Sequence, residues 1–135
     1  MKRDPRLHRL SSDHHHALVL ARRVKQAAQQ GGDEVERAWA EVIERFEAEL
    51  APHFDIEERC LLPALRTAGE ALLVDRTLAD HAAIRACVSG SGDRREHLAW
   101  FAELLEAHVR FEERELFETA QALLDREVLD AIAQA

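Results

Sequence analysis

The stretch that decides the fold is His53-Phe54-Asp55-Ile56-Glu57-Glu58-Arg59-Cys60-Leu61. It returns later in the chain as His108-Val109-Arg110-Phe111-Glu112-Glu113-Arg114-Glu115-Leu116. Both copies follow the pattern His-x-x-x-Glu-Glu-Arg-x-Leu. Residues four positions apart in a helix lie on the same face, so each copy directs one imidazole and one carboxylate toward the same place. Two such pairs facing each other predict a site for two metal ions.

Few helix-breaking residues occur, and they divide the chain into four long stretches rich in Ala, Leu, Glu and Arg. We expect four helices. The first starts after Ser11-Ser12-Asp13 and ends near residue 30, and the second runs from Asp33 to the low sixties. The third runs from about 70 to 89, and the fourth from Asp93 to about 124. A short tail helix is expected over 127–133. Short connections between long helices predict an all-α, antiparallel up-down-up-down four-helix bundle.

The length of 135 residues predicts a single domain that spans residues 1–135. Pro52 contradicts the pattern locally, because a proline inside a helix removes a backbone hydrogen bond and costs roughly 3 kcal/mol. We therefore expect a kink in the second helix, next to His53.

Apolar residues recur along the second and fourth helices in steps of three and four, which marks one face of each as buried. In the second helix this face contains Trp39, Ile43, Phe46, Leu50, His53, Glu57, Cys60 and Ala64. In the fourth it contains Phe101, Leu104, His108, Glu112, Glu115 and Thr119. His53, Glu57, His108 and Glu112 thus interrupt faces that are otherwise mostly apolar, and they are predicted to point inward.

The other two helices each carry an acidic residue followed by histidine, Asp13-His14 and Asp80-His81. His81 shares its face with apolar residues and is expected to point inward. On the first helix His14 lies on the apolar face and is the better candidate, whereas His15 stays open as an alternative because its spacing matches that of the third helix.

Four inward histidines and two inward glutamates form a nitrogen and oxygen ligand set that suits iron or manganese. Zinc commonly takes four ligands, and the sequence offers no pair of thiolates. Six protein ligands suit two ions bridged by carboxylates, and two divalent cations would neutralise Glu57 and Glu112. The alternative is a hydrogen-bonded polar seam that binds no metal. The neighbouring residues Glu58, Glu113, Arg59 and Arg114 are expected to form a solvated face or ion pairs around the site.

Charge and composition exclude several functions. The chain has 18 basic and 26 acidic residues and a net charge of −8, which argues against binding nucleic acid. No apolar run of eighteen residues and no secretory signal pattern occur, so we expect no membrane insertion and a cytoplasmic location. Cys60 and Cys87 are far apart in the sequence and are expected to be reduced thiols.

From Leu10 to about Leu124 the chain resembles the hemerythrin-like, His-His-Glu cation-binding domain family. The matching motifs are Asp13-His14-His15-His16-Ala17-Leu18, His53-x-x-x-Glu57-Glu58, Asp80-His81-x-x-Ile84 and His108-x-x-x-Glu112-Glu113-Arg114-Glu115-Leu116-Phe117. The resemblance implies a non-haem centre of two iron ions in a four-helix bundle, with Glu57 and Glu112 bridging the ions, histidines completing each coordination sphere, and an oxo, hydroxo or water bridge. Manganese or another divalent metal is the alternative cofactor. The family binds O2, NO or related oxidants such as peroxide.

Arg85 is a departure from the family pattern, because oxygen-carrying hemerythrins place a second histidine of the third helix at this position. This departure favours sensing or reaction over oxygen carriage, unless His15 supplies the fifth histidine. The ferritin-like oxidases are a competing class, but they use Glu-x-x-His motifs, and this chain has no such motif. It also has no tyrosine, which excludes a tyrosyl-radical role. The predicted function is binding or sensing of a small oxidant. The alternatives are an enzyme that acts on reactive oxygen or nitrogen species, and iron handling or repair, and the sequence identifies no protein partner.

Overall fold

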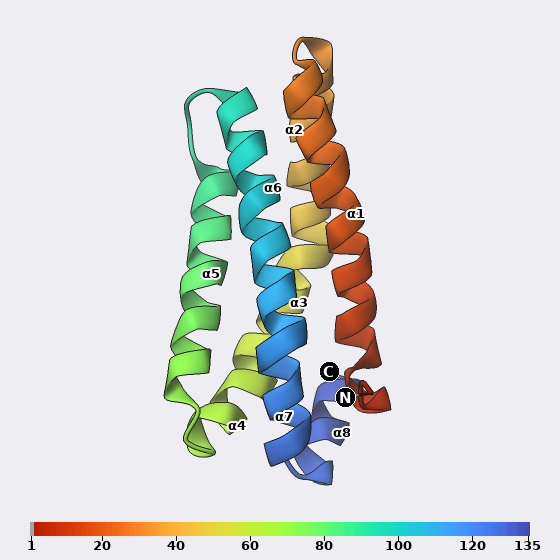
Figure 1. Cartoon of the computed structure of the whole chain (residues 1–135), viewed down its shortest axis with the longest axis vertical. Helices are drawn as coiled ribbons and strands as arrows, with labels where there is room; N and C mark the ends of the chain where they lie inside the picture. Colours follow the sequence, from red (N-terminus) through yellow and green to blue (C-terminus); the bar gives the residue numbers. More distant parts are fainter. Residues whose placement is uncertain (1) are drawn as a thin grey trace.

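The computed structural model describes residues 2–135 and shows four long helical segments that run alternately up and down (Figure 1). The first segment is α1 (His8–Gln30) and the third is α5 (Ala71–Ser89). The second segment spans residues 33–67 and the fourth spans residues 94–123. Residues 2–135 contain no strand. The predicted all-α, antiparallel four-helix bundle is confirmed.

The second and fourth segments change their helical winding along their length. The second consists of α2 (Asp33–Arg45), η2 (Phe46–Leu50), α3 (Ala51–Ile56), η3 (Glu57–Leu61) and α4 (Leu62–Thr67). The fourth consists of α6 (Arg94–Phe111), η4 (Glu112–Leu116) and α7 (Phe117–Leu123). The three η segments are single π-helical turns, a feature that often marks functional sites. Two of them begin at Glu57 and at Glu112, the matching glutamates of the repeated motif.

Pro52 lies in the first turn of α3, directly after the π-helical turn η2. A proline lacks the amide hydrogen that an uninterrupted helix needs at this point. A wider turn changes the pairing of the backbone groups and lets the helix continue past the proline. The segment is therefore rewound, not ended, on the N-terminal side of His53.

The prediction that the first helix begins after Ser11, Ser12 and Asp13 was wrong, because α1 begins at His8. The chain enters α1 through a short 3₁₀ turn, η1 (Pro5–Leu7). The side chains of Ser11 and Asp13, which the sequence suggested as helix caps, bond to residues of other helices. Tertiary contacts therefore override the local capping signal here.

The predicted tail helix is present as α8 (Arg126–Gln134), and the carboxylate of Asp125 caps its first turn. It lies across the end of the bundle that also holds both chain termini (Figure 1). It packs against η1 and η3, and Leu129 and Ile132 are buried there. This short helix closes one end of the apolar core.

The apolar interior consists of two clusters. One is formed mainly by α1, α2, α5 and α6 and includes Leu20, Val24, Val42, Phe54 and Phe101. The other, at the α8 end, includes Leu7, Leu61, Leu65, Leu116 and Phe117. Within residues 2–135, no helix is both long and apolar enough to cross a membrane.

Replacing Leu129 with alanine should show how much the docking of α8 stabilises the bundle. Leu129 is 2% exposed, so Leu129→Ala should lower the free energy of unfolding by about 2–5 kcal/mol. Leu72 is 85% exposed, and Leu72→Ala should change the free energy by less than about 0.5 kcal/mol. Urea unfolding measures both changes, and equal losses would contradict the packing of α8.

Candidate metal centre

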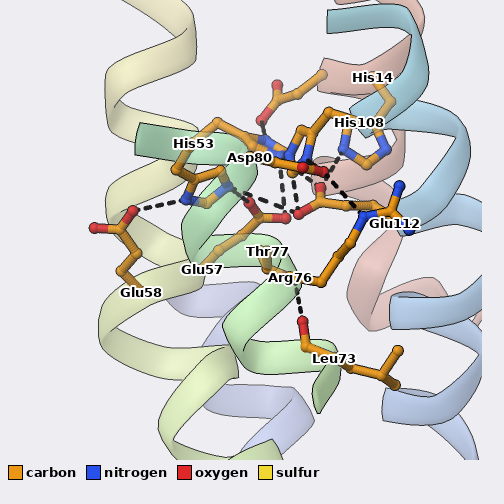
Figure 2. A network of polar contacts seen from close by, with 12 residues as sticks. His14, His53, Glu57, Glu58, Leu73, Arg76, Thr77, Asp80, His108 and Glu112 are labelled. Carbon is orange, nitrogen blue, oxygen red and sulfur yellow. Dashed lines mark hydrogen bonds and ion pairs between the residues drawn. The ribbon is translucent and has the colours of Figure 1, made fainter. Parts of the chain in front are cut away.

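Among residues 2–135, seven polar side chains are buried in the bundle. They are His14, His53, Glu57, Thr77, His81, His108 and Glu112. The Thr77 hydroxyl donates a hydrogen bond to the backbone carbonyl of Leu73, at 2.8 Å, within its own helix. The other six converge on one region from all four helical segments, and Figure 2 shows His14, His108, Glu57 and Glu112 among them.

Each helical segment contributes to this region in a regular way. His14 comes from α1 and His81 from α5, one imidazole from each uninterrupted helix. The segments that carry the repeated motif each contribute an imidazole from the last turns of an α-helix and a glutamate from the first position of a π-helical turn. The duplication seen in the sequence is thus a structural duplication as well.

We define the first donor group as His14, His53, Glu57 and Glu112, each of which has a nitrogen or oxygen atom within 4.8 Å of those of the others. The Nε2 atom of His14 lies 2.7 Å from Glu112 Oε1. The Nε2 atom of His53 lies 3.3 Å from Glu57 Oε2 and 3.7 Å from Glu112 Oε1. Two imidazoles thus face one oxygen of each glutamate.

We define the second donor group as Glu57, His81, His108 and Glu112, whose nitrogen and oxygen donor atoms also lie within 4.8 Å of one another. The Nε2 atom of His81 lies 3.1 Å from Glu57 Oε1 and 3.8 Å from Glu112 Oε2. The Nε2 atom of His108 lies 3.2 Å from Glu112 Oε2. This group therefore uses the other oxygen of each glutamate.

Both glutamates are shared between the two groups. Glu57 directs Oε2 to the first group and Oε1 to the second, and Glu112 directs Oε1 to the first and Oε2 to the second. A carboxylate with one oxygen toward each of two donor sets has the arrangement of a bridge between two cations.

Several buried atoms in this region have no hydrogen-bond partner. They are Nε2 of His53, Oε2 of Glu57, Nε2 of His108 and Oε2 of Glu112. Buried polar atoms are rarely left without partners in proteins, and each such atom costs about 1–3 kcal/mol. In each donor group one nitrogen and one oxygen lack a hydrogen bond, although they lie within ion-pair distance of each other, at 3.3 Å in the first group and 3.2 Å in the second. The residues present therefore fit a pair of cations, because cations would satisfy all four atoms.

The outer nitrogen of every imidazole in the cluster is held by a carboxylate. The Nδ1 atoms of His14 and His81 each lie 2.6 Å from a glutamate oxygen. Those of His53 and His108 each lie 2.9 Å from an aspartate oxygen. The four carboxylates, in the same order, belong to Glu113, Glu58, Asp13 and Asp80. Such contacts fix ring orientation and leave Nε2 facing the metal, as in many metalloproteins.

The buried charges shift the titration of the cluster. Burial alone would lower the pKa of His81, but hydrogen bonds and charge from Glu112 and Glu57 outweigh it and raise the pKa to about 9. Burial likewise lowers the pKa of His108, but the charge of Glu112 and a hydrogen bond to Asp80 raise it to about 10. Imidazolium groups thus balance the glutamates when no cation does so, and a metal ion must displace their protons.

The predicted site residues divide clearly in the structure. Six of them, namely His14, His53, Glu57, His81, His108 and Glu112, form the two donor groups. His15 is exposed on α1, where its ring lies near that of His16, and it belongs to neither group. Of the two candidates that the sequence left open on the first helix, His14 is the one that lies in a donor group.

Residues next to the motifs have roles that the sequence defined only in part. Glu58 and Glu113 bond to histidines of the cluster, whereas Arg59 pairs with Asp55 at the surface. The aspartate contacts to His53 and His108 were not predicted. Their only signal was the repeated acidic residue before histidine, and it does not reveal a partner on another helix. Arg85 bonds to Glu58 and lies outside both donor groups.

The fold and this cluster define a class, the four-helix bundles that bind cations through buried histidines and glutamates. Residues 6–120 match the model of the hemerythrin HHE cation-binding domain. The chain belongs to this family, which confirms the resemblance predicted from its sequence. No curated protein and no solved structure matches the chain.

The pKa shifts predict how the metal-free protein responds to pH. The folded-state pKa values of His81 and His108 lie above the ordinary value of 6.5, so their contribution to stability is complete below pH 6.5 and is lost as pH rises through about 9 and about 10. The free energy of unfolding of chelator-treated protein should therefore fall between pH 6.5 and about 9. Urea unfolding at a series of pH values measures it.

Two variants control this pH experiment. The exposed His15 makes no contact with the cluster glutamates, so His15→Gln should keep the slope of the wild type. His81→Gln removes one titrating group and should give a shallower slope. A free energy of unfolding that stays constant or increases over the same range would contradict the assigned charges.

Proposed function

We propose that the protein is a non-haem di-iron protein that binds or senses a small oxidant, namely O2, NO or peroxide. The observation that carries the proposal is the sharing of Glu57 and Glu112 between two donor groups. Each group offers two imidazole nitrogens and two carboxylate oxygens, one from each glutamate. Two cations held in this way would neutralise both buried carboxylates at once.

The donor chemistry supports iron. Imidazole nitrogen and carboxylate oxygen together suit iron and manganese, and thiolates are not among the donors of either group. Four protein donors for each ion also leave positions for an external ligand on a metal that accepts six. Manganese or another divalent ion would fit the same donors.

A small cavity beside the cluster supports a small ligand. It measures about 10 Å³, which is about the room that one water molecule needs. His14, His53 and His108 line it together with Asp13 and apolar side chains, namely Ala17, Leu50, Phe54, Leu105 and Val109. A space of this size favours a ligand of very few atoms over an organic substrate.

Bound iron would supply open coordination positions and the capacity to exchange electrons with such a ligand. The chain itself supplies the imidazoles, the bridging carboxylates and an apolar wall that limits the access of water. A sensing role would need a partner that responds to the ligand, and the residues assigned so far identify none. The cytoplasmic location expected from the sequence stays a prediction.

Metal content tests the proposal directly. Protein reconstituted with Fe(II) without oxygen, and then freed of unbound metal, should contain two iron ions per chain by elemental analysis. Removal of the iron with a chelator should lower the melting temperature, because cation binding stabilises the folded state. A hydrogen-bonded seam without metal predicts no bound iron and an unchanged melting temperature.

A pair of glutamate variants tests the bridging role. Glu112 and Glu115 both lie in η4, but Glu112 is buried in the cluster and Glu115 is exposed. Glu112→Ala removes an oxygen from both donor groups, so it should lower the iron content below two ions per chain. Glu115→Ala should keep the content of the wild type. Equal iron content in the two variants would contradict the bridging assignment.

Ligand addition separates a binding protein from an enzyme. NO or O2 added to the Fe(II) protein should change its visible absorption in proportion to the protein present, with saturation at a fixed ratio of ligand to protein. Continued consumption of peroxide or NO, absent in Glu112→Ala, would instead support an enzyme that acts on reactive oxygen or nitrogen species. No spectral change with any of the three ligands would contradict both functions.

A further inference from the structure

Two side chains, those of Glu58 and Phe54, contact His81, and Arg85 contacts both of them. Its Nδ1 atom lies 2.6 Å from Glu58 Oε2. Two guanidinium nitrogens of Arg85 donate to Glu58, one to each carboxylate oxygen, at 2.8 and 3.3 Å. The ring of Phe54 stacks on His81 with centroids 3.9 Å apart, and the Arg85 guanidinium lies 5.4 Å from the centre of the Phe54 ring. Arg85 thus touches both groups that hold His81.

His14, in the other donor group, is held in the same manner by residues from other parts of the chain. Its Nδ1 atom lies 2.6 Å from Glu113 Oε2. Arg3 donates to the Glu113 carboxylate at 3.2 Å and to the Glu113 backbone carbonyl at 2.8 Å. The ring of Phe117 stacks on His14 at 5.0 Å with an interplanar angle of 6°, and the Arg3 guanidinium lies 5.5 Å from the centre of that ring.

The two arrangements are similar but differ in detail. Arg85 donates to both carboxylate oxygens of Glu58, whereas Arg3 donates to one carboxylate oxygen of Glu113, and the Ser11 hydroxyl also donates to that carboxylate, at 2.9 Å. Glu58 and Glu113 are equivalent positions of the duplicated motif. The arginines are not equivalent, because Arg85 belongs to α5, whereas Arg3 belongs to the segment that precedes η1. In each donor group one histidine is therefore bound by a glutamate that an arginine contacts, and the two arginines come from different parts of the chain.

We propose that Arg85 and Arg3 are positioning residues, each of which sets the metal affinity of one donor group through the glutamate that holds its histidine. The proposal rests on the two-metal centre proposed above. Arg85 acts on the second donor group through Glu58, and Arg3 acts on the first through Glu113. It also gives Arg85, at the position where oxygen carriers have a histidine, a role that does not require it to bind metal.

Arg85 fixes the position of the Glu58 carboxylate, which in turn fixes the ring of His81. A carboxylate that accepts a hydrogen bond from Nδ1 keeps the ring in the orientation that leaves Nε2 for the metal. Glu58 is only partly buried, so its carboxylate could rotate into solvent if it were not held. The planar guanidinium of Arg85 holds both oxygens at once, which a flexible ammonium group does not do. Loss of the arginine should thus weaken the metal site without removing a ligand.

The test isolates each donor group by removing a histidine from the other. In a His14→Ala background the second group keeps all its donors, and in a His81→Ala background the first group does. The Co(II) affinity of the intact group is measured in each background by titration calorimetry. Arg85→Met should weaken binding roughly tenfold in the His14→Ala background and leave it unchanged in the His81→Ala background. Arg3→Met should give the reverse pattern.

Three additional variants make the result specific. Arg59→Met removes an exposed arginine next to Glu58 whose guanidinium pairs with Asp55, so it should change neither affinity. Glu58→Gln should reproduce the effect of Arg85→Met, and Arg85→Lys should restore the affinity only in part. The melting temperature of each metal-free variant shows whether the bundle is intact. If Arg3→Met prevents folding, the Arg85 and Glu58 variants decide the proposal alone.

The outcomes separate the two proposals. Wild-type protein that binds fewer than two Co(II) ions per chain would overturn the two-metal centre itself. Suppose that wild-type protein binds two ions, but Arg85→Met weakens Co(II) binding equally in both backgrounds or changes it in neither. This result would overturn the positioning role alone. A loss confined to the His14→Ala background supports it, because a general loss of stability would act on both groups.

Discussion

The structure depends on the burial of two carboxylates, those of Glu57 and Glu112, in the middle of an apolar bundle. Neither side chain is exposed to solvent. An isolated ionised carboxylate in such a place carries a penalty of several kcal/mol, and compensation has to come from groups beside it. The four histidines provide that compensation in the metal-free protein, and bound cations would provide it in their place. The positions of the helices, the rings and the outer carboxylates can all be understood as consequences of this constraint.

The cluster lies between two apolar cores, which pack together the helices that carry its side chains. Above and below it the helices pack through leucine, valine and phenylalanine side chains. Two of these side chains, Phe54 and Phe117, also stack on histidines of the cluster. The same packing that stabilises the bundle therefore orients the metal donors. The π-helical turns at Glu57 and Glu112 fit this view, because they change the helical winding where the two carboxylates enter the site.

The sequence predicted the fold well because its signals were local and repeated. Glycine-containing segments separate the helices, and the motif that appears twice places four of the six donors without any knowledge of tertiary structure. The assignment of His14 over His15 was harder, because neighbouring residues on a helix point about 100° apart and only the packing of α1 decides which one faces inward. The start of α1 was predicted wrongly because Ser11 and Asp13 have partners on other helices.

The outer contacts could not be predicted, because they join residues that are far apart in the sequence. Arg3 reaches Glu113, and Asp13 reaches His53, only after the four segments have assembled. The most direct test of the account is anomalous diffraction from crystals of the iron-loaded protein. It predicts two peaks, one beside His14 and His53 and one beside His81 and His108, with Glu57 and Glu112 between them. A single peak, or a peak bound by His15, would contradict the account.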